Sequence, residues 1–290
     1  MTAAHPRLSL NQATIKRASL ADALRLTAAS GIRSIGLWRE PVAEVGLETA
    51  VRMVADSGLR VSSLCRGGFF TSPDESTWRD SLDENRRAID ETAALAAAGA
   101  PGSAPVLVLV AGGLPEGSTD LIAARTRVGE ALAELEPVAK SAGVRLAIEP
   151  LHPMYAADRA VVSTLGQALD LAQPFSPHSV GVVVDTFHIW WDPEVLTDIA
   201  RAGSEGRIAS YQVADFMTPL PVDVLLGRAM MGDGHVDFAS LTDAVNQTGY
   251  RGDVEVEIFN AEIWADQPEI IVERTIRSFS DHIPLEEYGQ

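Results

Sequence analysis

The sequence predicts an α/β fold, a single (β/α)₈ TIM barrel, and three observations support this prediction. Eight short β-branched or apolar runs alternate with longer stretches of helical period. Two of these runs, Val106–Val110 and Val180–Val184, are apolar almost throughout, which is typical of parallel strands buried on both faces. No break in composition divides the 290 residues, and α/β barrels of about 250 residues commonly form one domain. We therefore expect one barrel domain over residues 1–290.

The eight strand-like runs are the expected barrel strands. In chain order they are Arg7–Ala13, Ser34–Trp38, Arg60–Cys65, Pro105–Ala111, Val144–Glu149, Val180–Asp185, Ile208–Val213 and Asp253–Phe259. Consecutive strands of such a barrel are joined by helices, so the chain between these runs is expected to be helical.

The intervening stretches carry the residues that begin and end helices. Ser19 and Gly31 flank the first stretch in the positions of an N-cap and a C-terminal glycine. Asp192 is expected to cap another helix that begins at Pro193, since proline is favoured at the first helical position. The expected helices are Ser19–Ser30, Leu47–Ser57, Trp78–Ala98, Leu121–Ala142, Leu165–Leu171, Pro193–Ala202, Leu241–Thr248 and Pro268–Phe279.

A doubly wound open sheet is the competing fold for this alternation. Such a sheet usually carries a glycine-rich phosphate-binding loop after its first strand. The segment Asn11–Ile15, which follows the first expected strand, contains no glycine. The barrel is therefore the favoured prediction.

The balance of charge limits the kinds of partner. Acidic residues outnumber basic ones by 40 to 23, which gives a formal net charge of -17. Such a surface repels phosphate backbones and anionic membranes, so we expect neither a nucleic-acid partner nor a membrane surface. No segment approaches the ~20 consecutive apolar residues that a membrane span requires.

The cysteine content and the first thirty residues predict a cytoplasmic protein. Cys65 is the single cysteine, so no intramolecular disulfide can form, as is usual in a reducing compartment. The first thirty residues carry several basic side chains and no long apolar stretch, and they do not resemble a signal peptide.

Polar side chains end four consecutive expected strands, at the barrel edge where active sites lie. They are Glu149, Asp185, Gln212 followed by Asp215, and Glu255 with Glu257. A buried carboxylate without a partner costs several kcal/mol, and a shared cation removes that cost. Oxygen ligands favour a hard divalent ion, so we expect Mn²⁺ first, with Mg²⁺ or Co²⁺ as alternatives. The competing interpretation is that these acids cap helices or pair with arginines.

Spacing along the strands selects among these side chains. Residues two apart on a strand share a face, and residues three apart do not. Gln212 and Asp215 therefore cannot both point into the barrel, whereas Glu255 and Glu257 can. The expected metal ligands are Glu149, Asp185, Gln212 and Glu257. Glu255 is expected to lie deeper, either paired with an arginine or supporting a ligand from behind.

Two histidines lie three residues beyond expected ligands. His152 follows Glu149, and His188 follows Asp185. Histidine titrates near neutral pH, so either ring is a candidate general acid or base, with a purely structural role as the alternative.

Four further residues are candidates for substrate binding. Arg66 and Phe69 lie in the loop after the third strand, where two glycines allow backbone to approach a ligand closely. Trp191 lies just beyond the sixth strand and is suited to stacking on a ring, and Arg228 lies in a long loop after the seventh. The alternatives are an ordinary turn, helix packing and surface ion pairs.

Four motifs carry a resemblance to a known family over nearly the whole chain. They are Ile148–Pro150, Val184–His188, Gly232–Asp237 and Glu257–Phe259. At these residues the sequence resembles the sugar phosphate isomerase/epimerase superfamily, the xylose isomerase-like TIM barrels. The resemblance implies a metal-dependent sugar isomerase or epimerase acting on a small-molecule sugar.

The ketose epimerases of that superfamily bind a divalent metal through Glu, Asp, His and Glu, and two of the glutamates also carry protons. The resemblance thus implies that Glu149, Asp185 and Glu257 are ligands, that both glutamates are catalytic, and that His188 lies near the substrate. The chain departs from the pattern at Gln212, which stands where the epimerases have histidine. An amide oxygen also binds Mn²⁺, but this departure is expected to weaken the metal's binding.

A narrower resemblance involves three segments: Gly36–Glu40, Cys65–Phe70 and Glu149–Pro153. They resemble the larger, catalytic (alpha) subunit of bacterial C-glycoside deglycosidases, which cleave 3-keto C-glycosides by elimination. This resemblance implies that His152 is the base, that the metal polarises the keto group, and that a small β-rich partner subunit is needed.

Two other classes compete with a metal-dependent enzyme of this kind: a non-catalytic sugar-binding barrel and a hydrolase like the endonucleases that act on damaged DNA. Six histidines and a net charge of -17 disfavour the endonuclease. Barrels of this kind are often oligomeric, so we expect an oligomer.

Overall fold

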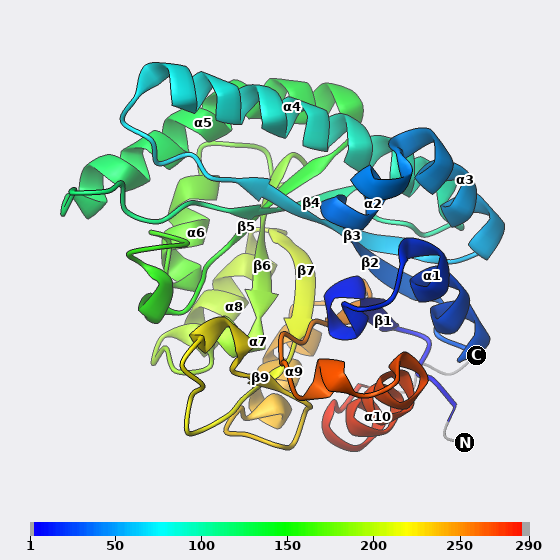
Figure 1. Cartoon of the computed structure of the whole chain (residues 1–290). Helices are drawn as coiled ribbons and strands as arrows, with labels where there is room; N and C mark the ends of the chain where they lie inside the picture. The colour runs from blue at the N-terminus through cyan, green and yellow to red at the C-terminus, as the bar shows by residue number, and fades with distance from the viewer. Residues whose placement is uncertain (1–2, 286–290) are drawn as a thin grey trace.

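Eight parallel strands pair edge to edge into a closed barrel in the computed structural model, which describes residues 3–285. The barrel order is β1-β10-β7-β6-β5-β4-β3-β2 (Figure 1). The strands are β1 Leu8–Asn11, β2 Ser34–Trp38, β3 Arg60–Gly68, β4 Val106–Val110, β5 Arg145–Glu149, β6 Val180–Asp185, β7 Ile208–Val213 and β10 Val254–Val256. Each strand begins within one of the eight expected runs, and the predicted fold class is confirmed. Strand β3 continues to Gly68, beyond the expected end at Cys65. The predicted domain of residues 1–290 extends beyond the described residues at both ends.

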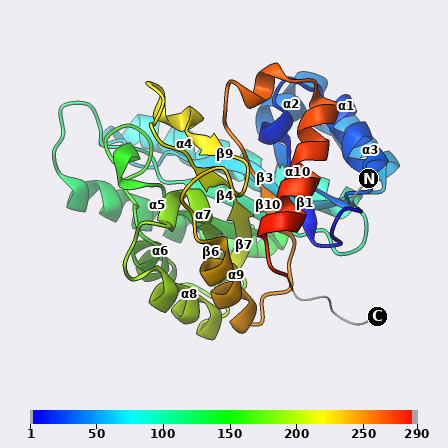
Figure 2. The ribbon, with the colours of Figure 1, turned by 90° about the horizontal axis from the view of Figure 1, so that it is seen from below.

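Helices cover the outside of the barrel (Figure 2). They are α1 Leu20–Ala29, α2 Arg39–Val45, α3 Leu47–Ser57, α4 Glu75–Ala98, α5 Leu121–Ala142, α6 Leu165–Ala172, α7 Thr186–Ile189, α8 Val195–Ser204, α9 Phe238–Gln247 and α10 Pro268–His282. Short 3₁₀ turns are η1 Gln12–Ile15, η2 Pro153–Tyr155, η3 Val224–Leu226 and η4 Ile263–Ala265. No helix among the described residues is long and apolar enough to cross a membrane.

The helix expected to begin at Pro193 starts two residues later. The carboxylate of Asp192 accepts a hydrogen bond from the amide of Glu194 at 3.0 Å, in a turn that precedes α8. Asp192 therefore stabilises the turn that precedes α8 and does not cap the first turn of the helix. Helices α2 and α7 were not expected, because seven and four residues are too few to show a helical period.

The barrel interior is apolar on one side and polar on the other. A small buried cluster of Cys65, Val106, Val108, Ala147 and Val183 fills the side formed by β3 to β6. The other side carries buried polar groups, namely Ser9, Asn11, Ser34, Ser62, Ser63, Gln212 and Glu255. Because β-branched side chains pack the first side tightly, the polar groups that carry chemistry are confined to the second side and to the strand ends.

A small antiparallel pair of strands extends the barrel edge after β7. Strand β8, Asp215–Phe216, pairs with β9, Arg228–Ala229, and the loop between them forms a hairpin. This pairing returns the chain to the carboxyl ends of the barrel strands, where Arg228 is buried.

Candidate active site

A cavity of about 440 Å³ opens at the carboxyl ends of the barrel strands. Buried ionisable groups line it, among them Glu149, His188, Arg228 and Glu257. Aromatic and basic side chains near them complete the wall: Trp38, Phe259, Arg66, Phe69 and Lys16. The cavity thus joins a polar interior to an aromatic and cationic mouth.

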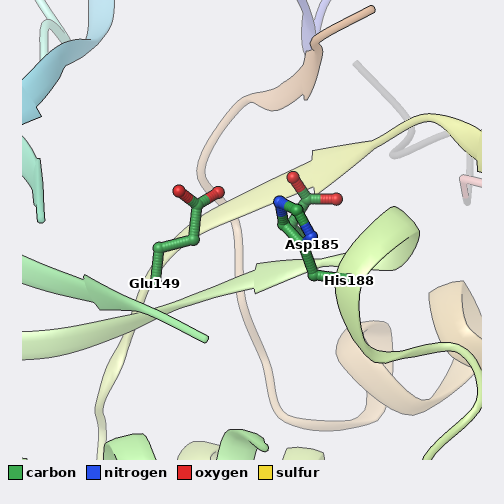
Figure 3. A group of neighbouring side chains, drawn as sticks. All are labelled: Glu149, Asp185 and His188. Atoms are coloured by element: carbon green, nitrogen blue, oxygen red, sulfur yellow. The ribbon is translucent and has the colours of Figure 1, made fainter. Parts of the chain in front are cut away.

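Two carboxylates and an imidazole converge at the inner end of this cavity, whose lining includes Glu149 and His188. Glu149 is the last residue of β5, Asp185 is the last residue of β6, and His188 lies in α7, which follows β6 directly. Each offers one ligand atom, and these atoms all lie within 4.8 Å of one another. Figure 3 shows the Glu149 carboxylate pointing toward Asp185, with the His188 ring beside it. All three residues are buried, so the group has the composition and size of a divalent-cation site.

Arg228 places a guanidinium group among the acids. It contacts Asp185 Oδ2 at 2.8 Å, Glu257 Oε2 at 3.1 Å and His188 Nε2 at 3.0 Å. Burial lowers the pKa of Arg228, but the carboxylates of Asp185 and Glu257 more than offset burial, and the pKa is raised. From the sequence alone, Arg228 was interpreted as either a substrate-binding residue or part of a surface ion pair. The structure places it in a buried ion pair, with only 3% of the residue exposed.

The two glutamates at the cavity hold protons more tightly than free carboxyl groups. Burial, and next the charge of Glu257, raise the pKa of Glu149 well above its ordinary value. Burial also raises the pKa of Glu257 to about 7, even though Arg228 acts in the opposite direction. At Glu257 desolvation therefore outweighs the ion pair, and this carboxyl group is suited to proton transfer near neutral pH.

The amide of Gln212 lies between acids on both neighbouring strands. Gln212 in β7 is in register with Asp185 in β6 and with Glu255 in β10. Its Nε2 donates to Glu255 Oε1 at 3.3 Å, whereas its Oε1 is buried and has no hydrogen-bond partner in the described part of the chain. Glu149 Oε1 is also buried without a partner there.

Glu149 Oε1 and Gln212 Oε1, which lack hydrogen-bond partners in the described part of the chain, indicate that the site suits a metal. A buried acceptor without a partner costs about 1–3 kcal/mol, and a cation removes that cost. With Asp185 and Glu257, the oxygens of Glu149 and Gln212 form a set of hard donors that fits a divalent cation.

The histidines lie side by side but face different surroundings. The backbone amide of His152 donates to His188 Nδ1 at 3.2 Å. Burial, and next the Arg228 charge, hold the pKa of His188 well below its usual range, and burial lowers the pKa of His152. Both rings are therefore neutral at pH 7. A neutral imidazole has one acceptor nitrogen, so His188 accepts a hydrogen bond from either the His152 amide or Arg228, but not from both. Its other nitrogen carries a proton and can donate to a substrate oxygen.

His152 and Trp191 pack together beside the cavity and are not among the residues that line it. The His152 ring lies 5.6 Å from the Trp191 ring and 5.4 Å from Phe216, centroid to centroid. Trp191 Nε1 donates to the His188 carbonyl at 2.8 Å. Trp191 thus contacts the backbone of α7 and supports His188 from outside the cavity.

Arg66 and Phe69, two expected substrate contacts, both lie at the mouth of the cavity. The Arg66 guanidinium lies 4.6 Å from the Phe69 ring centroid and 5.9 Å from that of Trp38. Phe69 remains 46% exposed, so its ring is available to a ligand.

Asp215 and Glu255, the two acids left out of the expected ligand set, are satisfied elsewhere. Asp215 accepts from the backbone amides of Phe216, Gly232, Gly234 and Val236, and so it holds the loop that contains the Gly232–Asp237 motif. Glu255 forms no ion pair with an arginine or lysine in residues 3–285. Its partners are serine hydroxyls and side-chain amides.

Sequence reasoning missed Asn11 and Lys16 as residues of the site. Asn11 ends β1 and donates to Glu255 at 2.6 Å, and Lys16 lines the cavity with its ammonium group 5.5 Å from the Phe259 ring centroid. The first strand ends at the same edge of the barrel as the four strands that carry the expected metal ligands. The position of these residues after that strand could therefore have predicted their place in the site.

Comparisons with known proteins agree with this architecture. A family model described as a xylose isomerase-like TIM barrel matches residues 24–281. Protein SMc04130 from Sinorhizobium meliloti 1021 is 44% identical with a TM-score of 0.90, over 96% of this chain and 98% of that chain. The IOLI protein, solved with a binding zinc atom, is 21% identical with a TM-score of 0.80, over 96% of this chain and 98% of that chain, which shows the shared fold.

Two curated enzymes are similar in sequence. Inosose isomerase of Halalkalibacterium halodurans is 27% identical over 162 residues, 53% of this chain and 55% of that protein. L-ribulose 3-epimerase of Mesorhizobium japonicum is 27% identical over 138 residues, 48% of this chain and 42% of that protein. The chain spans about half the length of the curated relatives that it matches.

Proposed function

The chain belongs to the xylose isomerase-like TIM barrel family, and we propose that it is a divalent-metal-dependent enzyme that removes a proton next to the carbonyl group of a sugar. One observation carries this proposal. Glu149, Asp185 and His188 place ligand atoms within 4.8 Å of one another at the ends of neighbouring strands. Beside them, buried oxygens of Glu149 and Gln212 have no hydrogen-bond partner in the described part of the chain. Buried oxygens without hydrogen-bond partners lower the stability of the fold. They are expected where a bound ligand supplies the missing partners.

Glu149, Asp185, Gln212 and Glu257 are the residues that would hold the cation, with Mn²⁺ as the proposed ion and Mg²⁺ or Co²⁺ as alternatives. When bound, the cation supplies polarisation of the substrate carbonyl and neutralises the charge that develops on its oxygen. The IOLI protein, which shares the fold, was solved with a binding zinc atom, which is consistent with a divalent ion.

The chain's own residues perform the proton chemistry. Glu149 and Glu257 reach the cavity from β5 and from beyond β10, and both have raised pKa values. One accepts a proton from the carbon next to the carbonyl, and the other returns a proton. Return to the opposite face of the same carbon gives an epimer, and return to the former carbonyl carbon, with a proton moved between the two oxygens, gives an isomer. Arg228 and the neutral His188 lie between them and are placed to hydrogen-bond substrate oxygens. Return of the proton makes the reaction an isomerisation or epimerisation.

The mouth of the cavity supports a second candidate function. Trp38, Phe69 and Phe259 line it, and aromatic rings at a mouth suit an aryl group attached to a sugar. Such a substrate is a 3-keto C-glycoside, and loss of its aglycone would follow the same proton abstraction. In that reaction His152 would be the base, and a small β-rich subunit would complete the enzyme.

Turnover on two substrate panels tests these proposals. The first panel contains inososes and free ketoses, and the second contains 3-keto glycosides with carbon- or oxygen-linked aglycones. Chelator-sensitive interconversion on the first panel supports the isomerase, and aglycone release without it supports the deglycosidase. Activity on neither panel, with no metal bound, would return the non-catalytic sugar-binding barrel to first place.

A further inference from the structure

Glu255 is a buried carboxylate for which the proposed reaction has no use. We propose that it is a positioning residue: it fixes the orientation of the Gln212 amide, so that the amide oxygen faces the metal site. The inference rests on the proposed function, because it assumes a cation among Glu149, Asp185 and Glu257.

The register of three strands places the residues side by side. Glu255 in β10 pairs with Gln212 in β7, and Gln212 pairs with Asp185 in β6. Residues in register on neighbouring parallel strands point to the same side of a sheet. Gln212 therefore has a barrel-interior carboxylate on each side, one from the metal site and one from Glu255.

Every side chain that contacts Glu255 can donate a hydrogen bond to it, and the two amides, Asn11 and Gln212, contact it through their nitrogens. Ser62 Oγ donates to Oε2 at 2.5 Å, and Ser63 Oγ lies 3.0 Å from Oε1 and 2.9 Å from Oε2. Asn11 Nδ2 donates to Oε1 at 2.6 Å. The Asn11 amide cannot be turned round, since its Oδ1 already accepts from the Ala13 amide at 2.9 Å and from Trp38 Nε1 at 2.8 Å.

A carboxylate that accepts from every neighbour determines which end of the Gln212 amide faces it. The amide nitrogen donates to Glu255 Oε1 at 3.3 Å, and the reversed amide would place two acceptor oxygens against each other. The amide oxygen therefore faces away from Glu255. This is the oxygen that is buried without a hydrogen-bond partner among the described residues.

The Glu255 carboxylate occupies the space that a side chain at position 36 would fill. A Cβ added at Gly36 would lie 2.5 Å from Glu255 Oε1, far inside van der Waals contact. The glycine thus gives the carboxylate room, and the strand backbone behind it limits its movement.

An amide ligand depends on such a device, because a half-turn of its last torsion exchanges the oxygen that binds a metal for a nitrogen that does not. Groups that orient a ligand from behind commonly change metal affinity about 10- to 100-fold.

Calorimetric titration of the metal-free protein with Mn²⁺ tests the inference as a double-mutant cycle. The proteins are the wild type, Glu255→Gln, Gln212→Ala and the double variant. Glu255→Gln removes the negative charge and replaces one of the two acceptor oxygens by a donor, so the Gln212 amide is held less firmly and the dissociation constant for Mn²⁺ is expected to rise by about tenfold or more. The same substitution in the Gln212→Ala background is expected to change it little, because the amide through which Glu255 acts is gone.

Asp253→Asn is the matched control. Asp253 precedes Glu255 by two residues in the chain, and its carboxylate contacts Ser34 and Arg60 instead of Gln212. This variant is expected to lose stability and to keep wild-type Mn²⁺ affinity. If circular dichroism shows that Glu255→Gln does not fold, Glu255→Asp, which withdraws the carboxylate by one methylene, takes its place in the same cycle.

Two results would overturn the inference while leaving the proposed function intact. One is wild-type Mn²⁺ affinity in the folded Glu255 variant. The other is an equal loss of affinity in the wild-type and Gln212→Ala backgrounds. A wild-type protein that binds no divalent ion would instead overturn both proposals together.

Discussion

Glu255 and Glu257 stand two residues apart and face the same barrel interior, yet their surroundings differ in kind. Glu255 is surrounded by hydroxyl and amide donors from Ser62, Ser63 and Asn11, and it meets no cation in residues 3–285. Glu257 lies just beyond the end of β10, lines the cavity and contacts the Arg228 guanidinium at 3.1 Å. Glu255 and Glu257 are therefore adjacent inward-facing positions with different roles. Glu255 orients a neighbouring side chain, whereas Glu257 is available for chemistry.

Depth in the barrel explains the difference. At the level of Glu255, the neighbouring strands carry short polar side chains and Gly36, so donors surround the carboxylate on fixed backbone. At the level of Glu257 strand β10 has ended, and the carboxylate contacts the charged side chain of Arg228 from β9 and the thiol of Cys65 from β3. A carboxylate at this level remains accessible from the cavity, and proton transfer to or from a substrate requires that access.

The largest expected difference between the two glutamates is in kcat at saturating Mn²⁺. Glu257→Gln removes a proton carrier, so kcat should fall by roughly 10²- to 10⁴-fold. Glu255→Gln should recover most of its activity when Mn²⁺ saturates, because its defect lies in metal affinity. Steady-state kinetics across a Mn²⁺ series measures both, and equal kcat losses at saturation would remove the distinction.

Arg228→Met tests the cation that faces Glu257 but not Glu255. In the metal-free protein it leaves the buried Asp185 and Glu257 carboxylates unpaired, and the free energy of unfolding should fall by about 3–5 kcal/mol. Added Mn²⁺ should restore part of the loss, since it neutralises the same acids. Urea unfolding with and without Mn²⁺ measures this; a stability unaffected by the substitution would show that the ion pair is not needed.

The pH dependence of stability distinguishes Glu257 further. Its pKa rises from 4.5 to about 7 on folding. An acid with a raised folded-state pKa stabilises the fold fully below its unfolded pKa, and that stability is lost as pH rises through the folded value. The chelated protein should therefore lose stability between about pH 4.5 and pH 7, and Glu257→Gln should flatten that decline. Urea unfolding at a series of pH values measures it, and an unchanged slope in the variant would assign the decline to other groups.

The smallest expected effect concerns the space beside Glu255. Gly36→Ala places a methyl group against Glu255 Oε1, and the overpacking should cost about 1–3 kcal/mol of stability. The variant should leave the pKa of Glu257 unchanged, since Gly36 does not contact it. Thermal unfolding measures the loss, and full wild-type stability would mean that the Glu255 carboxylate moves more freely than its contacts suggest.

The sequence was a good guide to strands and to strand ends, because both are local properties. Alternation along the chain predicted all eight barrel strands, and the two-residue period predicted that Glu255 and Glu257 share the interior. The partner of Glu255 was not predictable in this way. An arginine was one expectation, but Ser62, Ser63 and Asn11 lie 192 to 244 residues away in the chain, and only barrel closure brings them there.

The surroundings of Arg228 and Trp191 show the same limit. Arg228 reaches the acids because β8 and β9 pair and fold the long loop back over the barrel, and two-residue strands leave no pattern in the sequence. Trp191 stands near a strand end as expected, but a helical turn directs its indole to the His188 backbone and not to the cavity.

Hydrogen exchange detects the removal of a carbon-bound proton before any product is identified. Inososes, ketoses and 3-keto glycosides are incubated with the Mn²⁺-loaded protein in D₂O, and proton NMR follows the C–H signals next to the carbonyl. At least one of these signals is expected to be lost to deuterium with the wild type, and to be retained with chelator or with Glu257→Gln. Full retention of every such signal by the metal-loaded wild type, in all three substrate classes, would show that the protein does not remove this proton.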